Sequence, residues 1–355
     1  MKKDIAFIFP YNTWGGAFRS TYSLGGCLLK KGYNVDIIFP FIPPRNGYKK
    51  FSYKWFYIKI RGIIRSLLRG KKIRIDTDLN IIIIPWISSL WIKNYDYIIA
   101  NHWNTIDDVY KLPERCGEKW HYIRDIEQWS FYYEQELKGF KLPIKKIVVA
   151  KWIKDFLFKE YNIPVKAVIT NGTEVSRFEI IKEKPPLKNI CIGMCCSDHP
   201  MKGIKYGLEA MRKLSLLNKN LKFILFGYKK PSNLNFKYEW IQAPTGENLR
   251  EVYRRIHIFI SPSIQEGFHN PPREAMSAKC ALIATNVGCI PDLGKDCENM
   301  LIVKKRSSKD IEEAIKKIIE DKSLMKKLVR NAFNTIKNEN WESRANQFGQ
   351  TLLIK

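Results

Sequence analysis

Residues 261–276 read SPSIQEGFHNPPREAM, and they follow the apolar run Ile258–Ile260, which has the length and character of a buried strand. The stretch passes through a loop rich in glycine and proline into a predicted helix that opens near Pro272. Proline is favoured in the first turn of a helix, where its missing N–H is not needed. The N–H groups of that turn attract anions. The pattern therefore predicts a strand, an anion-binding loop and a helix in succession.

A carboxylate stands on each side of the predicted anion site. Glu266 precedes the loop, and Glu274 lies in the first turn of the helix. This arrangement suits a ligand with a phosphate in the middle and hydroxyl-rich groups at both ends, such as a nucleotide sugar. The same residues also fit an ordinary loop in which Glu274 only stabilises the helix dipole.

Strands and helices alternate through both halves of the 355-residue chain. Residues 5–39 read as a strand, a glycine-rich loop, a helix and a strand. The charged, proline-containing run 182–188 reads as a linker, and a second series starts at Asn189. Strands that alternate with helices form parallel sheets covered on both faces. The sequence therefore predicts two α/β domains of the Rossmann type, with ligands beyond the carboxyl ends of the strands.

The formal net charge of +26 has three interpretations: binding to nucleic acid, to an anionic membrane surface, or to acidic substrates. Residues 45–75 hold eleven Lys and Arg and no acidic residue. Apolar residues recur there at helical spacing beside a stripe formed by Arg61, Arg65 and Arg69, with Trp55 at one end. This pattern favours a helix on anionic lipid, and the alternative is a helix that covers the sheet with a solvated basic face. No nucleic-acid-binding module is visible.

Other classes of protein find little support in the sequence. The apolar runs are too short to span a bilayer, and the apolar start ends at Pro10, short of a signal peptide. We therefore expect a cytoplasmic protein. Eight cysteines without a C-x-x-C pair lack metal-site spacing, so we expect neither a metal nor a cofactor. The serine, cysteine and histidine content shows no pairing of a nucleophile with a base.

The stretch at 266–276 resembles the E-x7-E signature of retaining glycosyltransferases of family 4, which have the GT-B fold. Typical members read Glu-Gly-Phe-Gly-x-Pro-x-x-Glu-Ala-Met, and residues 266–268, Pro271 and residues 274–276 match this pattern. His269 replaces the usual glycine, and Arg273 stands where an aliphatic residue is common.

The resemblance implies roles for the donor side. Glu266, as a candidate catalytic residue, would hold hydroxyls of the transferred sugar, and Glu274 would hold the ribose hydroxyls. The backbone of Phe268, His269 and Asn270 would face the sugar and its diphosphate.

Two further loops would contact the diphosphate. Lys202-Gly203 matches a Lys-Gly element of the family, although the arginine that usually accompanies it has no clear counterpart. Gly16 lies in the first glycine-rich loop, which in the family faces the donor diphosphate and the acceptor.

The first domain would bind the acceptor. Asp125 and Glu127 stand where members of the family often have a histidine, in a pattern similar to the Gln-Asp-x-Glu variant of the branch that includes rhamnosyltransferase-like enzymes. Asp125 is a second candidate catalytic residue, and His102 and Glu127 are candidates on the acceptor side. These carboxylates either orient an acceptor hydroxyl or pair with Arg124 or other cations.

The resemblance covers nearly the whole chain and predicts two Rossmann-like domains facing each other across a cleft. It places an acceptor-binding domain at residues 1–178, a nucleotide-sugar-binding domain at 179–338 and a final helix that crosses back at 339–355.

The implied function is a retaining transfer of a sugar from a nucleotide-sugar donor to a glycan or lipid-linked acceptor, in cell-surface polysaccharide or glycolipid synthesis. The enzyme would lie on the inner face of the membrane as a peripheral protein. Two alternatives stay open: a nucleotide-sugar epimerase, and a non-catalytic basic protein on the same scaffold that binds membrane or nucleic acid.

Overall fold

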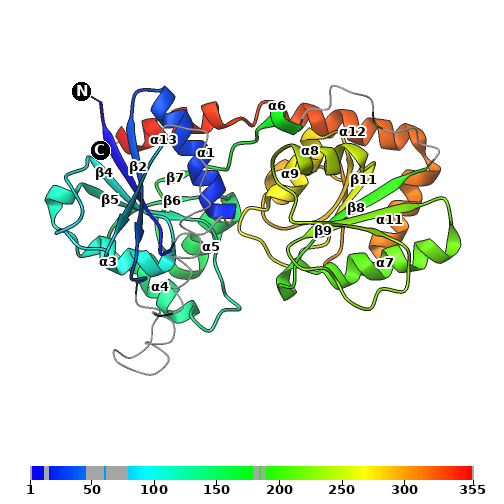
Figure 1. Cartoon of the computed structure of the whole chain (residues 1–355), viewed down its shortest axis with the longest axis horizontal. Helices are drawn as coiled ribbons and strands as arrows, with labels where there is room; N and C mark the ends of the chain where they lie inside the picture. The colour runs from blue at the N-terminus through cyan, green and yellow to red at the C-terminus, as the bar shows by residue number, and fades with distance from the viewer. Residues whose placement is uncertain are drawn as a thin grey trace. The chain divides into compact units, whose positions relative to one another are not determined.

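The structure is a computed structural model, and it divides the chain into two compact units (Figure 1). The first comprises Met1–Gly172 with Trp341–Lys355, and the second comprises Thr173–Asn340. The residues that the structure describes are 2–11, 16–44, 60, 79–178, 184 and 189–353.

The basic segment at 45–75 falls almost entirely outside the described residues. The candidate membrane contacts Trp55, Arg61, Arg65 and Arg69 therefore lie outside them, and their role stays a prediction. Of the helices that the structure describes, none combines the length and the apolar character needed to cross a bilayer.

A parallel sheet of seven strands forms the centre of the first unit, in the order β3-β2-β1-β4-β5-β6-β7. The strands are β1 (Asp4–Ile8), β2 (Asn34–Pro40), β3 (Asn80–Ile84), β4 (Tyr97–Ala100), β5 (Glu118–Ile123), β6 (Lys145–Val148) and β7 (Ala167–Val168). Its helices are α1 (Gly16–Lys30), α3 (Ile106–Tyr110), α4 (Tyr133–Lys141), α5 (Lys151–Tyr161) and α13 (Trp341–Leu353), with short 3-10 turns at Trp103–Thr105 and Glu114–Cys116. Strands covered on both faces have apolar residues on both faces, as β1 and β4 do.

The last helix, α13, belongs to the first unit although it ends the chain. It lies beside α1, red against blue in Figure 1. The ring of Phe348 lies 5.7 Å from that of Phe7 and 5.6 Å from that of Tyr122, between ring centroids. The Gln347 amide donates a hydrogen bond to the Val168 carbonyl at 3.1 Å. These contacts join the end of the chain to the first sheet.

The second unit contains a parallel sheet of six strands in the order β10-β9-β8-β11-β12-β13. The strands are β8 (Cys191–Cys196), β9 (Lys222–Gly227), β10 (Glu239–Gln242), β11 (Ile258–Ser261), β12 (Ala281–Thr285) and β13 (Leu301–Val303). Its helices are α6 (Val175–Phe178), α7 (Ile204–Leu217), α8 (Gly246–Arg255), α9 (Asn270–Ser277), α10 (Ile290–Leu293), α11 (Ser308–Glu320) and α12 (Lys322–Ile336), with a 3-10 turn at Pro200–Lys202.

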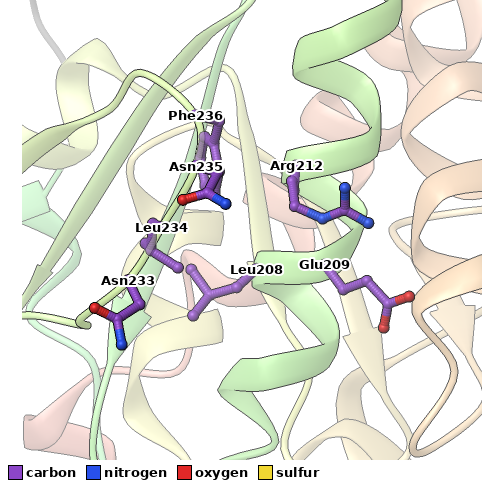
Figure 2. Close-up of a pocket in the computed structure, with 7 residues that line it drawn as sticks. All are labelled: Leu208, Glu209, Arg212, Asn233, Leu234, Asn235 and Phe236. Atoms are coloured by element: carbon purple, nitrogen blue, oxygen red, sulfur yellow. The ribbon is translucent and has the colours of Figure 1, made fainter.

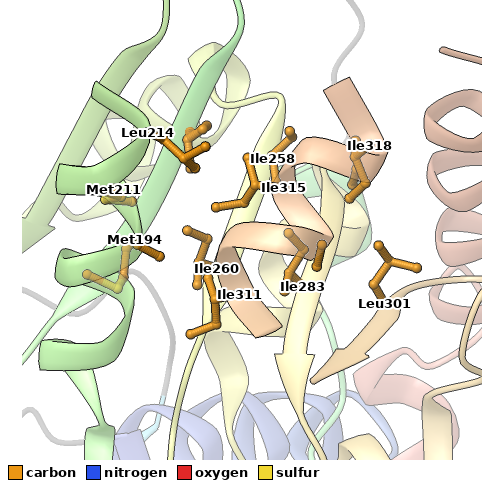
Figure 3. Close-up of a cluster of buried hydrophobic side chains, with 14 of the residues drawn as sticks. Met194, Met211, Leu214, Ile258, Ile260, Ile283, Leu301, Ile311, Ile315 and Ile318 are labelled. Atoms are coloured by element: carbon orange, nitrogen blue, oxygen red, sulfur yellow. The ribbon is translucent and has the colours of Figure 1, made fainter. Parts of the chain in front are cut away.

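The core of the second unit is a layer of aliphatic side chains between its sheet and the helices α7 and α11 (Figure 3). Ile258, Ile260 and Ile283 come from the strands, and Met211 and Ile315 come from the two helices. Each of these side chains is at most 1% exposed, and burial of one such side chain stabilises a fold by roughly 1.5–3 kcal/mol. This layer supports the loops at the carboxyl ends of β8 and β11.

The boundary between the units falls after Gly172 and not at residue 178, where the sequence placed it. Helix α6 contacts α8 and α9 of the second unit, and Phe178 packs edge-on against Tyr253 with centroids 5.6 Å apart. The Thr173 N–H donates to the Glu339 carbonyl at 2.6 Å. The chain therefore enters and leaves the second unit at adjacent points.

Candidate functional site

The candidate site lies where the strand order of the second sheet reverses. Strands β8 and β11 are neighbours in the sheet but far apart in the sequence. Lys202 follows the carboxyl end of β8, and Glu266 follows that of β11. Open parallel sheets bind ligands at such a switch point, because the loops on either side diverge there.

Gly203 brings the two loops into contact. It has a φ of +61°, and a Cβ atom at this position would lie 2.1 Å from the Pro262 carbonyl oxygen. Only glycine fits this close approach. The Ile264 N–H also donates to the Met201 carbonyl at 2.7 Å. The Lys-Gly element therefore fixes Lys202 against the loop that carries Glu266.

Glu266 is the centre of a compact polar cluster. Its carboxylate is 2.6 Å from the Lys202 ammonium and accepts a hydrogen bond from the Ser263 hydroxyl at 2.7 Å. The imidazole Nε2 of His269 lies 3.2 Å from the same carboxylate and 2.9 Å from the Ser261 hydroxyl. Since Glu266 is only 7% exposed, these partners replace most of its water.

The cluster holds one charge pair and one neutral imidazole. Burial lowers the pKa of His269 to about 4, so its ring is neutral at pH 7. Burial by itself would raise the pKa of Glu266, but His269, Lys202 and Ser263 together bring it below its ordinary value. Because the imidazole is neutral at pH 7, Lys202 and Ser263 keep Glu266 ionised there.

A second loop supports the backbone of Phe268 and His269. The Cys289 N–H donates to the Phe268 carbonyl at 2.7 Å, and the Cys289 thiol lies 3.3 Å from the His269 carbonyl. A Cβ at Gly288 would lie 2.6 Å from the Phe268 carbonyl oxygen. His269 itself has a φ of 78°, a conformation that costs a non-glycine residue about 1–2 kcal/mol. The surrounding contacts offset this strain.

A cavity of about 100 Å³ opens beside the cluster and is lined by residues of both loops, among them Cys195, Ser197, Lys202, Glu266, His269 and Pro271. Binding pockets for whole ligands usually measure about 300–1,000 Å³, so this cavity has room for part of a nucleotide sugar. A separate hollow of about 110 Å³ lies between α7 and the loop at 233–236 (Figure 2). Glu209 and Arg212 are among its lining residues, and none of the residues of the polar cluster is.

Glu274 lies one helical turn after Asn270, the first residue of α9, and its partner lies outside the polar cluster around Glu266. The Tyr253 hydroxyl, from α8, donates to its carboxylate at 2.8 Å. Tyr253 is fully buried, and its ring packs against those of Phe226 and Phe259. The sequence did not identify Tyr253, because an aromatic residue on a helix reads as core. Its hydroxyl nevertheless fixes the position of Glu274.

Asn270 begins α9, and Gly16 begins α1. The Phe268 ring is buried under the guanidinium of Arg273, 4.9 Å from the ring centroid. The donor-side candidates therefore fall into the cluster around Glu266, the helix start at Asn270, and Glu274 with Tyr253. Gly16 belongs to the first unit.

In the first unit, His102, Asp125 and Glu127 lie beyond the carboxyl ends of β4 and β5. Burial lowers the pKa of His102 to about 4, and its Nδ1 accepts the Asn104 N–H at 3.4 Å. The Glu127 N–H donates at 3.0 Å to Glu136, which is 2% exposed. Burial raises the pKa of Glu136 to about 8 and also raises that of Glu127. Glu136 was not predicted, because its link to the loop depends on how α4 packs.

Arg124 is held by neutral groups. Its guanidinium donates to the hydroxyl of Thr21 at 2.6 Å and to the side-chain carbonyls of Asn171 at 2.9 Å and Asn101 at 3.2 Å. It also stacks on the Tyr122 ring, 3.8 Å from the centroid. This network joins α1 to the ends of β4 and β5. The sequence offered Arg124 as an alternative partner for Asp125 and Glu127. In the structure its guanidinium binds the hydroxyl and amide groups of this network.

Within the described part of the chain, no three His, Cys, Asp or Glu side chains gather as a metal site would require. The expectation of a metal-free reaction stays a prediction.

Comparison with known proteins finds a family model that matches residues of the second unit. Residues 176–335 match the family model described as Glycosyl transferases group 1. The capsular polysaccharide biosynthesis glycosyltransferase CapM of Staphylococcus aureus is 26% identical over 215 residues, which cover 56% of this chain and 57% of that protein. A glycosyltransferase of Methanocaldococcus jannaschii is 28% identical over 206 residues, 56% of each chain. The chain thus spans just over half the length of these curated relatives.

Solved structures show the same fold over the whole chain. TarM has a TM-score of 0.76 at 11% identity and covers 100% of this chain and 99% of its own. Sucrose-phosphate synthase from Thermosynechococcus elongatus has a TM-score of 0.74 at 16% identity, with 98% of each chain covered. HepE from Anabaena, in complex with UDP and glucose, has a TM-score of 0.73 at 13% identity, with 99% of each covered. The chain therefore has the GT-B fold of two Rossmann-like domains, and its residues 176–335 are similar to the glycosyl transferases of group 1.

Proposed function

We propose that this protein is a retaining glycosyltransferase that moves a sugar from a nucleoside diphosphate sugar to a glycan or lipid-linked acceptor. The observation that carries this proposal is the ionised Glu266 beside Lys202, at the switch point of the second sheet. A carboxylate and an ammonium 2.6 Å apart beside a small cavity offer acceptors for sugar hydroxyls and a cation for phosphate.

On donor binding, the Lys202 ammonium would turn toward the diphosphate and offset its charge as the nucleotide leaves. Glu266 would keep the hydrogen bond from Ser263 and accept others from the sugar. Glu274, held by Tyr253, would bind the ribose hydroxyls. These roles are suggested by the contact between Lys202 and Glu266. The sugar hydroxyls would replace Lys202 as donors to Glu266, and the diphosphate would replace Glu266 as the anion beside Lys202.

Retention is consistent with the partners of Glu266. With the donor bound, hydrogen bonds from Ser263 and from the sugar hydroxyls would lower the nucleophilicity of its carboxylate, and His269 is neutral. We therefore favour same-face displacement, in which the leaving diphosphate takes the proton of the acceptor hydroxyl. No metal enters this scheme.

The role in surface polysaccharide or glycolipid synthesis is supported by the name of CapM, a capsular polysaccharide glycosyltransferase. We further propose that the enzyme works at the cytoplasmic face of a membrane, because the chain carries a net charge of +26 and the basic segment at 45–75. Flotation with phosphatidylglycerol vesicles and with phosphatidylcholine vesicles tests this part. Equal recovery with both lipids would contradict it.

The donor is tested first by a thermal-shift screen of UDP-, GDP-, ADP- and dTDP-sugars. We expect one nucleotide class to raise the melting temperature of the wild type. Glu274→Ala should abolish the shift, whereas Glu247→Ala, an exposed carboxylate on α8, should retain it. The absence of any shift would contradict the proposal.

The product then separates the transferase from its closest alternative. The donor class identified in the screen is incubated with and without an acceptor, and the sugar nucleotide is analysed by NMR. Transfer that requires an acceptor supports the proposal, and an isomerised donor formed without acceptor identifies an epimerase.

A further inference from the structure

We propose that the first unit binds its acceptor through a row of aromatic rings, and that this acceptor is a neutral carbohydrate whose ring stacks on that row. The inference rests on the proposed transferase function and adds the chemical class of the acceptor. We call the row the aromatic shelf, and its residues are Tyr11, His102, Trp103, Phe131 and Tyr132.

The rings of the shelf follow one another without a gap. The centroids of Tyr11 and His102 are 6.5 Å apart, and those of His102 and Trp103 are 5.6 Å apart. Trp103 and Tyr132 are stacked at 5.6 Å with an angle of 27° between their planes. Phe131 continues the row edge-on at 5.7 Å from Tyr132. Each step lies near the separation of interacting aromatic pairs.

The shelf lies at the edge of the sheet where ligands of this fold bind. Tyr11 follows β1, His102 and Trp103 follow β4, and Phe131 and Tyr132 follow β5. The strand order reverses between β1 and β4, so the shelf starts at the switch point of the first sheet. Three loops that are distant in the sequence therefore contribute to one surface.

The outer end of the shelf is open to solvent. Phe131 is 86% exposed, and the neighbouring Trp129 is 47% exposed. Exposed apolar patches occur at ligand-binding grooves, at protein interfaces and at membrane contacts, and the sugar-binding test below separates the first of these from the last. The C–H groups on one face of a pyranose ring carry a slight positive charge, and they pack on the negative face of an aromatic ring.

The charges beside the shelf favour a neutral, hydroxyl-rich ligand over an anionic membrane. Asp125 and Glu127 lie in the same loop as Phe131. Carboxylates accept hydrogen bonds from sugar hydroxyls and repel anionic headgroups. His102 is neutral at pH 7 because burial lowers its pKa to about 4, so it adds no positive charge.

The test measures carbohydrate binding without any nucleotide. Saturation-transfer NMR titrations use maltotetraose, chitotetraose and a rhamnose-containing tetrasaccharide against the full chain. We expect at least one to bind the wild type, with an affinity about tenfold lower in Phe131→Ala and lower still in the double variant with Trp129→Ala. Phe158→Ala, which removes a ring 61% exposed on α5 of the same unit, should bind as the wild type does.

The proposal is overturned if none of the three sugars binds at 20 mM, or if Phe131→Ala binds as well as Phe158→Ala. It is also overturned if Phe131→Ala abolishes binding to phosphatidylglycerol vesicles while sugar binding is unchanged, since the shelf would then be a membrane contact. Because the measurement needs no donor, sugar binding together with a failed thermal-shift screen would contradict the transferase function and leave the shelf in place.

Discussion

Both sheets of this protein are parallel and have a switch point at the carboxyl ends of their strands, but different side chains stand at the two switch points. At the switch point of the second sheet stand the charged pair Lys202 and Glu266, with the neutral His269 beside them. At the switch point of the first sheet stands a row of rings that begins at Tyr11 and His102. The parallel strands determine where a ligand would bind in each unit, and the side chains of the loops determine which chemistry that ligand would need.

The two edges also differ in how they hold charge. In the second unit a buried carboxylate is ionised because an ammonium lies 2.6 Å away. In the first unit the buried Glu136 has a pKa of about 8, because burial outweighs the hydrogen bond that it accepts. The switch point of the second sheet therefore suits a charged ligand, and that of the first sheet suits a neutral one. The following predictions test this difference, from the largest expected effect to the smallest.

Lys202→Ala should have the largest effect, because it removes the cation that neutralises both Glu266 and the bound diphosphate. We expect kcat/KM for the donor to fall about a thousandfold, or ~4 kcal/mol. Steady-state kinetics with the donor identified by thermal shift measure it. Lys205→Ala, an exposed lysine on α7, is the matched control. Equal activity of the two variants would show that the second edge does not depend on this charge.

Glu136→Gln should remove a pH dependence of stability that arises in the first unit. The carboxyl of Glu136 titrates near 4.5 when unfolded and near 8 when folded. The folded state therefore holds the extra proton, and its stability falls as the pH rises from about 4.5 to about 8. We expect a loss on the order of 3 kcal/mol in the wild type over this range, and a flatter profile in Glu136→Gln.

Urea unfolding at pH 5, 6.5 and 8 measures this dependence, with the exposed Glu134→Gln on the same helix as the control. The free energies of unfolding are compared between variants at each pH, because a protein of two units need not unfold in one step. If the wild type is as stable at pH 8 as at pH 5, Glu136 is ionised in the folded state and the contrast between the two edges disappears.

Tyr253→Phe should have the smallest effect, because it keeps the buried ring and removes only the hydroxyl that holds Glu274. A hydrogen bond to a charged group contributes about 1.5–3 kcal/mol. We therefore expect KM for the donor to rise about tenfold with kcat little changed. Tyr238→Phe, in the same unit, should change neither constant. A fall in kcat with an unchanged KM would show that Tyr253 acts on the reaction and not on donor binding.

Sequence reasoning identified the second edge more fully than the first. The apolar strand, the loop and the early prolines at 258–276 are local signals, and the helix starts at Asn270, two residues before the position expected from Pro272. His269, with its left-handed backbone, immediately precedes that start.

Some elements of the structure have weak signals in the sequence or none. Strand β10 is short, lies at the edge of its sheet and is half-exposed, so it lacks the continuous apolar run that marks the central strands. The membrane contacts at Trp55, Arg61, Arg65 and Arg69 rest on sequence alone, because they lie outside the described residues.

What the sequence by itself determined was the succession of strands and helices, the two Rossmann-like halves and the loop that carries Glu266. These features follow from hydrophobic periodicity and from the backbone preferences of glycine and proline, which act over a few residues. Only the tertiary structure decided the partners: Lys202 with Glu266 across 64 residues, Tyr253 with Glu274, and Tyr11 beside His102. These pairs form because parallel strands bring distant loops to one edge, and no local pattern records which loops will meet there.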